Sequence, residues 1–296
     1  MKYDTICLSG CGIFGFTFLG AIDKLIDENI ININDINTWI GTSAGAIISF
    51  IFCLGYNIDE LLDFIDNFNF NILLPKKLKL FNILNTNGLN NGNKFIFIFK
   101  KFIFNKFNTE NLTFKELYNL TNKKLIIIGT NYTNNTEECF SFENTPDMSI
   151  ITAVRISMSI PIVFSPILYN SCYYIDGGIK NNFPFNYCNQ DSTLGICINK
   201  NHINNTINNI FNIFKISLSM ILNNTVKYNN INVIYIDYIN DYHNNNITYS
   251  EIDLSNENIN KMISYGRNSI NNYLSNINNK LIQTKSLYTN ISTQTD

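Results

Sequence analysis

The sequence predicts an α/β fold with a mainly parallel sheet, and two stretches near the amino terminus carry this prediction. Residues 3–9 form a short apolar run that ends at Gly10, and a helical pattern follows through residues 19–26. Residues 38–40 form a second short strand, and the apolar run over residues 46–54 is typical of a core helix. Because strand, helix, strand and helix follow one another at this spacing, they form a βαβ unit, which requires a parallel sheet covered by helices.

Further strands and helices are expected along the rest of the chain. Strand patterns lie at residues 124–129, 138–142, 173–175, 193–198 and 232–238, and helical patterns lie at residues 149–157, 207–227 and 256–274. Because no repeat or linker interrupts this part of the sequence, we expect one domain over residues 1–277. Residues 278–296 are polar and aperiodic, which predicts a flexible tail.

The composition excludes several classes of protein. Hydrophobic residues make up 45% of the chain, enough for a large core, and a formal net charge of -2 argues against a nucleic-acid-binding protein. The 7 cysteines form no Cys-x-x-Cys pair and there are only 2 histidines, so neither a zinc site nor a disulfide framework is expected. The amino terminus lacks the pattern of a signal peptide, and no apolar run reaches the roughly 18 residues that span a bilayer. We therefore expect a cytoplasmic protein.

The strongest chemical signal is a serine in the sequence Gly41-Thr42-Ser43-Ala44-Gly45, between a predicted strand and a predicted helix. A serine on such a sharp turn adopts a strained backbone, and small residues two positions to either side prevent a collision between the strand and the helix. The turn also places the hydroxyl at the amino end of a helix, where the helix dipole favours negative charge. This pattern predicts that Ser43 is a nucleophile; the alternative is a serine that caps the helix in a tight turn.

A glycine-rich loop, Gly-Cys-Gly-Ile-Phe-Gly over residues 10–15, separates the first strand from the first helix. Glycines allow backbone N–H groups to converge on one point, which is the geometry of an oxyanion hole. The same residues match Gly-x-Gly-x-x-Gly, so a site for a dinucleotide cofactor is an alternative. Such a site needs an acid about 20 residues further on, at the end of the second strand. The nearest candidate, Asp35, lies in an asparagine-rich loop, and the second strand ends at Ser43 instead.

A nucleophilic serine needs a base, and Asp176 is the candidate. It follows a predicted strand and precedes two glycines, so little side-chain bulk surrounds it and it is able to approach Ser43 from a neighbouring strand. The alternative explanation of this sequence is a simple Asp-Gly turn. A full Ser-Asp-His triad would need His202 or His243, but both histidines lie among asparagines, where a solvated loop residue is expected.

Taken together, these motifs resemble those of the patatin-like phospholipases. The loop at residues 10–15, the serine turn at residues 41–45 and the Asp-Gly-Gly at residues 176–178 have that family's order and spacing. Residues 157–164, Ser-Met-Ser-Ile-Pro-Ile-Val-Phe, are similar to the segment that precedes the family's Asp-Gly-Gly, and the similarity covers residues 4–190. The resemblance implies a three-layer α/β/α sandwich and hydrolysis of fatty acyl esters in phospholipids, as in a phospholipase of the A type.

The resemblance also implies roles for individual residues. It implies a catalytic dyad, without histidine, of Ser43 and Asp176. It implies an oxyanion hole formed by Gly10, Cys11, Gly12 and Ile13. It implies supporting roles for the small residues Gly15, Gly41, Gly45, Gly177 and Gly178. No metal or cofactor is expected, since the sequence contains no acidic cluster with the spacing of metal ligands.

Two residues depart from the family's loop, which typically reads Gly-Gly-Gly-x-Arg/Lys-Gly. Cys11 replaces the second glycine, and Phe14 replaces the basic residue. If position 11 required a positive φ, a cysteine there would cost about 1–2 kcal/mol in strain. Loss of the cation would weaken support for the oxyanion or for the lipid headgroup. We expect an active enzyme; the alternatives are a catalytically silent lipid-binding relative and a serine esterase for small soluble esters.

Two further segments predict partners other than the acyl-lipid substrate. Residues 67–109 carry seven lysines and no acidic residue in an apolar, aromatic stretch, which favours peripheral contact with an anionic membrane through Lys76, Lys77 and Lys79. The alternative is one or two core helices whose lysines line the outer face. The Thr-Gln-Thr of Thr293–Thr295 resembles peptides that add a strand to dynein light chain, and the alternative there is an inert tail.

Overall fold

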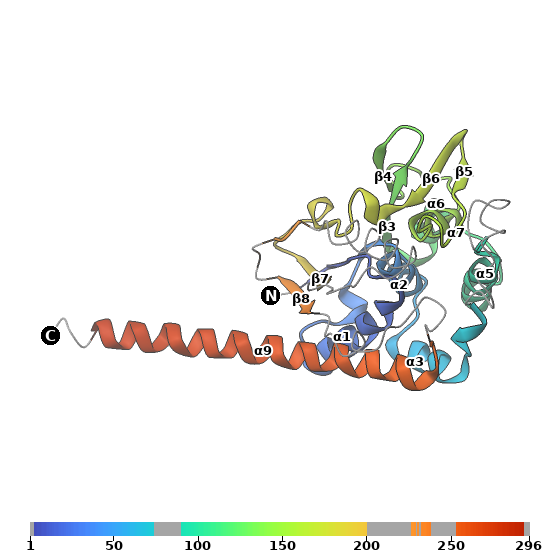
Figure 1. Cartoon of the computed structure of the whole chain (residues 1–296). Helices are drawn as coiled ribbons and strands as arrows, with labels where there is room; N and C mark the ends of the chain where they lie inside the picture. Colours follow the sequence, from blue (N-terminus) through green and yellow to red (C-terminus); the bar gives the residue numbers. More distant parts are fainter. Residues whose placement is uncertain are drawn as a thin grey trace, which may run out of the picture.

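A mixed, mostly parallel sheet forms the centre of the computed structural model, which describes residues 3–73, 90–199, 226–228, 230, 232–237 and 253–292 (Figure 1). The strands run in the order β5-β6-β3-β2-β1-β7-β8, and β4 also pairs with β3. They are β1 (Thr5–Leu8), β2 (Thr38–Thr42), β3 (Lys124–Asn131), β4 (Thr136–Phe140), β5 (Ile167–Tyr169), β6 (Cys172–Asp176), β7 (Thr193–Asn199) and β8 (Val233–Asp237). The predicted α/β fold is confirmed.

The strands divide into a parallel part and an antiparallel part. The strands β8, β7, β1, β2 and β3 run parallel to one another, whereas β4, β5 and β6 are joined to the sheet by antiparallel pairs. β1 lies inside the parallel part and is buried along its whole length, as its continuous apolar sequence predicts. The sequence pattern does not predict β5, because a strand of 3 residues is too short to show a clear alternation.

Helices flank this sheet (Figure 1). The α-helices are α1 (Phe16–Asp27), α2 (Ala44–Cys53), α3 (Ile58–Asn67), α5 (Asn93–Phe107), α6 (Phe114–Thr121), α7 (Ile150–Ser157) and α9 (Asn256–Ser292). Short 3-10 helices are η1 (Gly12–Gly15), η2 (Ile33–Asp35), η3 (Phe70–Leu73), η4 (Gly177–Ile179) and η5 (Phe185–Tyr187). The helix α5 falls in the lysine-rich stretch and is one of the helices considered there, whereas α3 and α6 are not predicted.

The two faces of the sheet bury different side chains. In β1, Ile6 and Leu8 belong to a large apolar core that also contains residues of α1, α2, α7 and α9, whereas Cys7 between them belongs to a smaller core with Phe183 and Phe185. This alternation follows from the period of two residues along a strand. The large core also contains Ala44 of the serine turn. The helices α1, α2, α7 and α9 and the serine turn therefore lie on the same side of the sheet.

The helix α9 packs along α1 and then continues beyond the body of the protein (Figure 1). Glycines allow the close contact: a Cβ on Gly20 would collide with the backbone of α9, and a Cβ on Gly266 would collide with the backbone of α1. The predicted end at Leu274 is wrong, because α9 continues to Ser292. The hydrophobic periodicity that predicts the helix stops in the polar segment after the core, so the sequence pattern misses this extension. Flexibility of the tail stays a prediction.

Several predicted features lie outside the described residues. They are Lys76, Lys77, Lys79, His202, His243, Thr293–Thr295 and, apart from its last two residues, the helix over 207–227. Within the described ranges, no helix combines the length and the apolar character needed to cross a bilayer.

Candidate active site

Ser43 lies on the tight turn between β2 and α2, as the sequence predicts. Its backbone has φ 54° and ψ -118°, a conformation that costs of order 1–3 kcal/mol for a residue other than glycine. The flanking glycines are needed because a Cβ on Gly41 would collide with the backbone of Gly45, and a Cβ on Gly45 would lie 2.5 Å from the carbonyl oxygen of Leu8. Backbone packing on both sides therefore fixes Ser43 at the carboxyl end of β2 and the amino end of α2.

A buried hydrogen bond also holds this turn. The N–H of Ser43 donates to the Oγ of Ser157 at 2.8 Å. Ser157 is the last residue of α7, which packs against α2. Ser157 belongs to the family-like segment over residues 157–164, but the sequence does not predict this contact, because the contact depends on how two helices distant in sequence pack together.

Asp176 contacts Ser43 directly, although 133 positions separate them in the sequence. The Oγ of Ser43 donates a hydrogen bond to the Oδ2 of Asp176 at 2.7 Å. Asp176 is the last residue of β6. Because Thr42 is in register with Ile128, and Asp176 with Gly129, the end of β6 lies beside the end of β2.

The remaining polar groups of Asp176 are bonded within the protein. Its Oδ1 accepts the N–H of Gly178 at 2.7 Å, its N–H donates to the carbonyl of Ser159 at 2.9 Å, and its carbonyl accepts the hydroxyl of Thr130 at 2.9 Å. The residue is only 1% exposed. These bonds orient the carboxylate so that one oxygen faces Ser43.

The glycine loop lies against the serine turn. The N–H of Gly10 donates to the carbonyl of Asn182 at 2.8 Å, and the Nδ2 of Asn182 donates to the carbonyl of Gly10 at 3.0 Å. A Cβ on Gly10 would collide with the side chain of Asn182 and would lie 3.3 Å from the Cβ of Ser43. Asn182, which no sequence motif predicts, therefore ties the loop to the segment after Asp176. Its place shortly after the Asp-Gly-Gly is the one signal that could have drawn attention to it.

Cys11 is accommodated without the strain of a positive φ. Its φ is -152°, and the positive φ of the loop, 60°, falls at Gly12, where no Cβ opposes it. Phe14 packs, partly buried, against the large core. Phe14 thus stands where the family's loop typically has a basic side chain, and Cys11 leaves the backbone conformation of the loop unstrained. The loop also approaches α2 closely, since a Cβ on Gly15 would lie 3.1 Å from the Cβ of Ala44.

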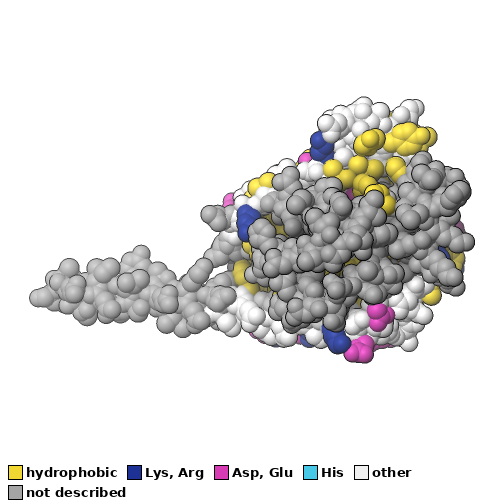
Figure 2. All heavy atoms as spheres, viewed as in Figure 1, with side chains coloured by type: hydrophobic (Ala, Val, Ile, Leu, Met, Phe, Trp, Pro, Cys, Tyr) yellow, Lys and Arg dark blue, Asp and Glu magenta, His cyan; other side chains and the backbone are white. Residues whose placement is uncertain are grey.

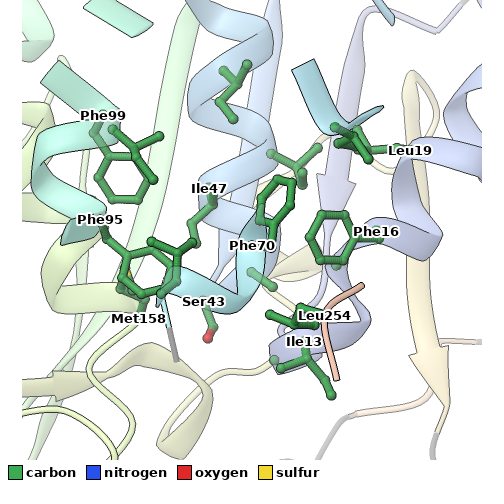
Figure 3. Close-up of a pocket in the computed structure, with 18 of the residues that line it drawn as sticks. Ile13, Phe16, Leu19, Ser43, Ile47, Phe70, Phe95, Phe99, Met158 and Leu254 are labelled. Carbon is green, nitrogen blue, oxygen red and sulfur yellow. The ribbon is translucent and has the colours of Figure 1, made fainter. Parts of the chain in front are cut away.

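An apolar cavity of about 240 Å³ lies beside Ser43 (Figure 3). Among the described residues that line it, only Ser43 and Asn90 have polar side chains, and none is charged. Along α2, the cavity is lined by Ser43, Ile47 and Ile51, which extend about 12 Å along the helix. Other parts of the wall come from Ile13, Phe16, Leu19, Leu61, Phe64, Ile65, Phe70, Leu73, Phe95, Ile98, Phe99, Phe102, Met158, Ile160, Val163, Phe164 and Leu254.

A buried arginine supports one wall of this cavity. Arg155 donates to the Oγ of Ser159 at 2.6 Å and to the carbonyls of Asn91 and Ser165 at 3.1 Å and 3.3 Å. Its guanidinium carbon lies 4.9 Å from the ring centroid of Phe164. Burial lowers the pKa of Arg155 to about 10, so the side chain stays cationic at neutral pH. Arg155 thereby joins α7 to the loop that precedes α5.

The surroundings of the glycine loop disfavour the dinucleotide alternative. The loop contributes Gly12, Ile13 and Gly15 to an apolar cavity, whereas a pyrophosphate site presents polar groups to its ligand. The strand β2 ends at Thr42, before the serine turn, and Asp35 lies in η2, ahead of that strand. A hydroxyl bonded to a carboxylate beside an apolar cavity suits acyl transfer, in which the hydroxyl is the nucleophile and the carboxylate the base.

Comparisons with known proteins agree with this fold. Residues 6–188 match the family model described as patatin-like phospholipase. The chain is 39% identical over 185 residues to the probable lipid hydrolase 463L of Invertebrate iridescent virus 6, a match that covers 62% of this chain and 62% of that relative. It is 30% identical over 247 residues to the uncharacterized protein R571 of Acanthamoeba polyphaga mimivirus, covering 80% of this chain and 81% of R571.

A solved structure shows the same fold at low sequence identity. VipD from Legionella pneumophila superposes with a TM-score of 0.63 at 19% identity, over 93% of this chain and 67% of VipD. The family model covers more than half of the chain, and the matched region contains the glycine loop, the serine turn and the Asp-Gly-Gly. This chain belongs to the patatin-like phospholipase family.

Proposed function

We propose that this protein is a serine lipid acyl hydrolase of the phospholipase A type, with Ser43 as nucleophile and Asp176 as base. One observation carries the proposal: the Oγ of Ser43 donates a 2.7 Å hydrogen bond to Asp176 at the edge of a cavity lined by apolar side chains. A buried carboxylate in this position is able to accept the serine proton without a histidine between them.

The reaction would follow two acyl-transfer steps. As Ser43 attacks the ester carbonyl, its proton passes to Asp176, and the collapse of the tetrahedral intermediate breaks the ester bond. The lysophospholipid leaves as an alcohol that takes the proton from Asp176, and the acyl group stays on Ser43. Asp176 then removes a proton from water, the hydroxide attacks the acyl ester, and the fatty acid leaves as Ser43 regains its proton.

Backbone N–H groups of the glycine loop would stabilise the oxyanion. Within η1, the N–H of Phe14 donates to the carbonyl of Cys11, so the N–H groups of Gly12 and Ile13 precede the first bond inside this helix. The first N–H groups of a helix have no acceptor within it and are suited to bind an anion. The same loop lies against Ser43, which supports the roles predicted for Gly10, Cys11, Gly12 and Ile13.

The cavity favours a fatty acyl chain as the part of the substrate that binds beside Ser43. The described residues of its wall carry no charged side chain, so a charged headgroup would lose hydration beside them without gaining a partner. An alkyl chain would instead replace water along Ile47 and Ile51. The printed name of 463L, probable lipid hydrolase, and the description of the family also support a lipid substrate.

Labelling with a fluorophosphonate tests the nucleophile, and mass spectrometry of products from mixed phospholipid vesicles tests the reaction. We expect the wild-type protein to be labelled at Ser43 and to release fatty acids and lysophospholipids, and Ser43→Ala to do neither. Ser49→Ala is the matched control, since it removes a buried hydroxyl on the same helix for which the described residues offer no hydrogen-bond partner. A wild-type protein that binds vesicles but neither reacts with the probe nor releases product would be a silent lipid-binding relative.

A further inference from the structure

The helix α5 carries large apolar side chains both toward the apolar cavity and toward solvent. Its inner side lines the cavity with Phe95, Ile98, Phe99 and Phe102. On its outer side, the side chain of Phe97 is 61% exposed and that of Phe104 is 43% exposed. Exposed phenylalanines that form a group on one surface indicate an interaction site more strongly than scattered ones do.

A lysine stands between these two rings. The Nζ of Lys101 lies 5.7 Å from the ring centroid of Phe97 and 5.6 Å from that of Phe104. Positions 97, 101 and 104 are spaced four and three residues apart, so they form one stripe along the helix. We call Phe97, Lys101 and Phe104 the α5 face.

The charge of α5 is uniformly positive. The helix contains Lys94, Lys100, Lys101 and Lys106 and no acidic residue. Two of these charges are partly neutralised by surface ion pairs, Lys100 with Glu110 at 3.0 Å and Lys106 with Glu60 at 2.7 Å. Neither pair involves Lys101, so the α5 face itself presents a cation between two apolar rings.

We propose that the α5 face binds the surface of an anionic lipid bilayer. Phe97 and Phe104 would enter the boundary between headgroups and acyl chains, while Lys101 would stay at the level of the lipid phosphates. Because the opposite side of α5 lines the cavity, this contact would hold the cavity close to the lipid that it takes up. The inference therefore extends the proposed function, although binding itself requires no chemistry at Ser43.

The charges and the location of α5 favour a bilayer over other occupants. A symmetric pair of chains joined through this face would bring lysines of both copies together, and like charges across an interface are unfavourable. A second exposed apolar surface covers the sheet edge formed by β5 and β6 (Figure 2), where Leu168 is 60% and Tyr173 51% exposed. That edge lies near the acidic strand β4, which pairs with β3 beside it, so it is less suited to anionic lipid.

Sedimentation with vesicles tests the proposal, using Ser43→Ala as the parent so that no lipid is consumed. The vesicles contain phosphatidylcholine, with or without phosphatidylglycerol. We expect the parent to bind vesicles with phosphatidylglycerol, more weakly as salt is added. The pair Phe97→Ser with Phe104→Ser should lower the partition coefficient about tenfold or more, and Lys101→Glu about tenfold.

Matched variants separate the α5 face from exposed side chains in general. The controls are Leu168→Ser with Tyr173→Ser on the sheet edge, and Lys115→Glu on α6, and they should bind as the parent does. Unchanged thermal unfolding shows that each variant is folded. Parental binding by the α5 variants, or an equal loss in the controls, would overturn the proposal.

A fluorescent reporter gives a second test. The single tryptophan, Trp39, is fully buried in the large core, so Phe97→Trp adds an exposed tryptophan to α5. Its emission should shift to shorter wavelength with anionic vesicles, and an unshifted emission would contradict insertion. The proposed function is tested apart from this, because Phe97→Ser with Phe104→Ser in the wild-type background should still hydrolyse a soluble short-chain ester. If these variants bind vesicles normally while the wild type hydrolyses lipid, the docking inference alone fails.

Discussion

The turn around Ser43 and the wall of the cavity lie side by side, but they depend on different kinds of contact. At the turn, a single Cβ on Gly41 or Gly45 would meet backbone atoms. Along the wall, contacts join side chains, as between the rings of Phe95 and Phe99 or of Phe50 and Phe99. Side chains repack after a change of shape, whereas backbone pressed against backbone does not. The turn therefore holds Ser43 in one position, whereas the wall of the cavity is able to adapt its shape.

The largest effect is expected where the turn meets Asp176. Asp176→Asn keeps the size of the side chain but removes the base, so kcat/KM for a phospholipid should fall about a thousandfold or more. Asp191→Asn, at an exposed turn position, should leave the rate unchanged. Steady-state hydrolysis by both variants decides this, and a rate within tenfold of wild type for Asp176→Asn would contradict the proposed base.

A methyl group at the turn should be the next most damaging change. In Gly45→Ala the new Cβ would lie 2.5 Å from the carbonyl oxygen of Leu8, so we expect a loss of about 3 kcal/mol in the free energy of unfolding. Gly55→Ala is the control, because Gly55 has a φ of 88° but nothing within 4 Å of the added Cβ, and about 1 kcal/mol of strain is expected. Equal losses in urea unfolding would mean that close packing at position 45 is unimportant.

A change in the wall should alter selectivity and leave the chemistry intact. Ile51→Trp fills the part of the cavity two helical turns from Ser43, so kcat/KM for a long-chain ester should fall about tenfold. The rate with a short-chain ester should change little, and Ile51→Val should retain both rates. A chain-length series of esters measures this effect, and an equal loss for every chain length would show that the cavity does not hold the acyl chain.

The smallest effect is expected from the bond that holds the turn from α7. Ser157→Ala removes the acceptor of the Ser43 N–H, and a buried amide without an acceptor costs about 1–3 kcal/mol. We expect kcat to fall about fivefold to tenfold with little change in KM, because the nucleophile is positioned less well. Ser149→Ala, at the other end of α7, is the control and should keep the wild-type kcat. A change in KM alone would indicate a role in substrate binding instead.

Local signals in the sequence predicted much of the fold and could have predicted more. The parallel strands β1 and β2 and the helices α1 and α2 follow from apolar runs and glycines that are close in sequence. The helices α3 and α6 were missed, although each begins with a capping box, Asn57 with Glu60 and Thr113 with Glu116. These boxes are visible as an asparagine or threonine followed three residues later by glutamate.

The sequence by itself determined the shape of the serine turn, because the steric conditions for that turn lie within the five residues from Gly41 to Gly45. Only the tertiary structure decided the distance between Ser43 and Asp176, since it depends on an antiparallel strand, β6, whose register against β3 the sequence pattern does not specify. The same holds for the cavity, which is lined by side chains from helices that are far apart along the chain. Local geometry is encoded locally, whereas the contact between Ser43 and Asp176 and the cavity depend on packing across the whole sheet.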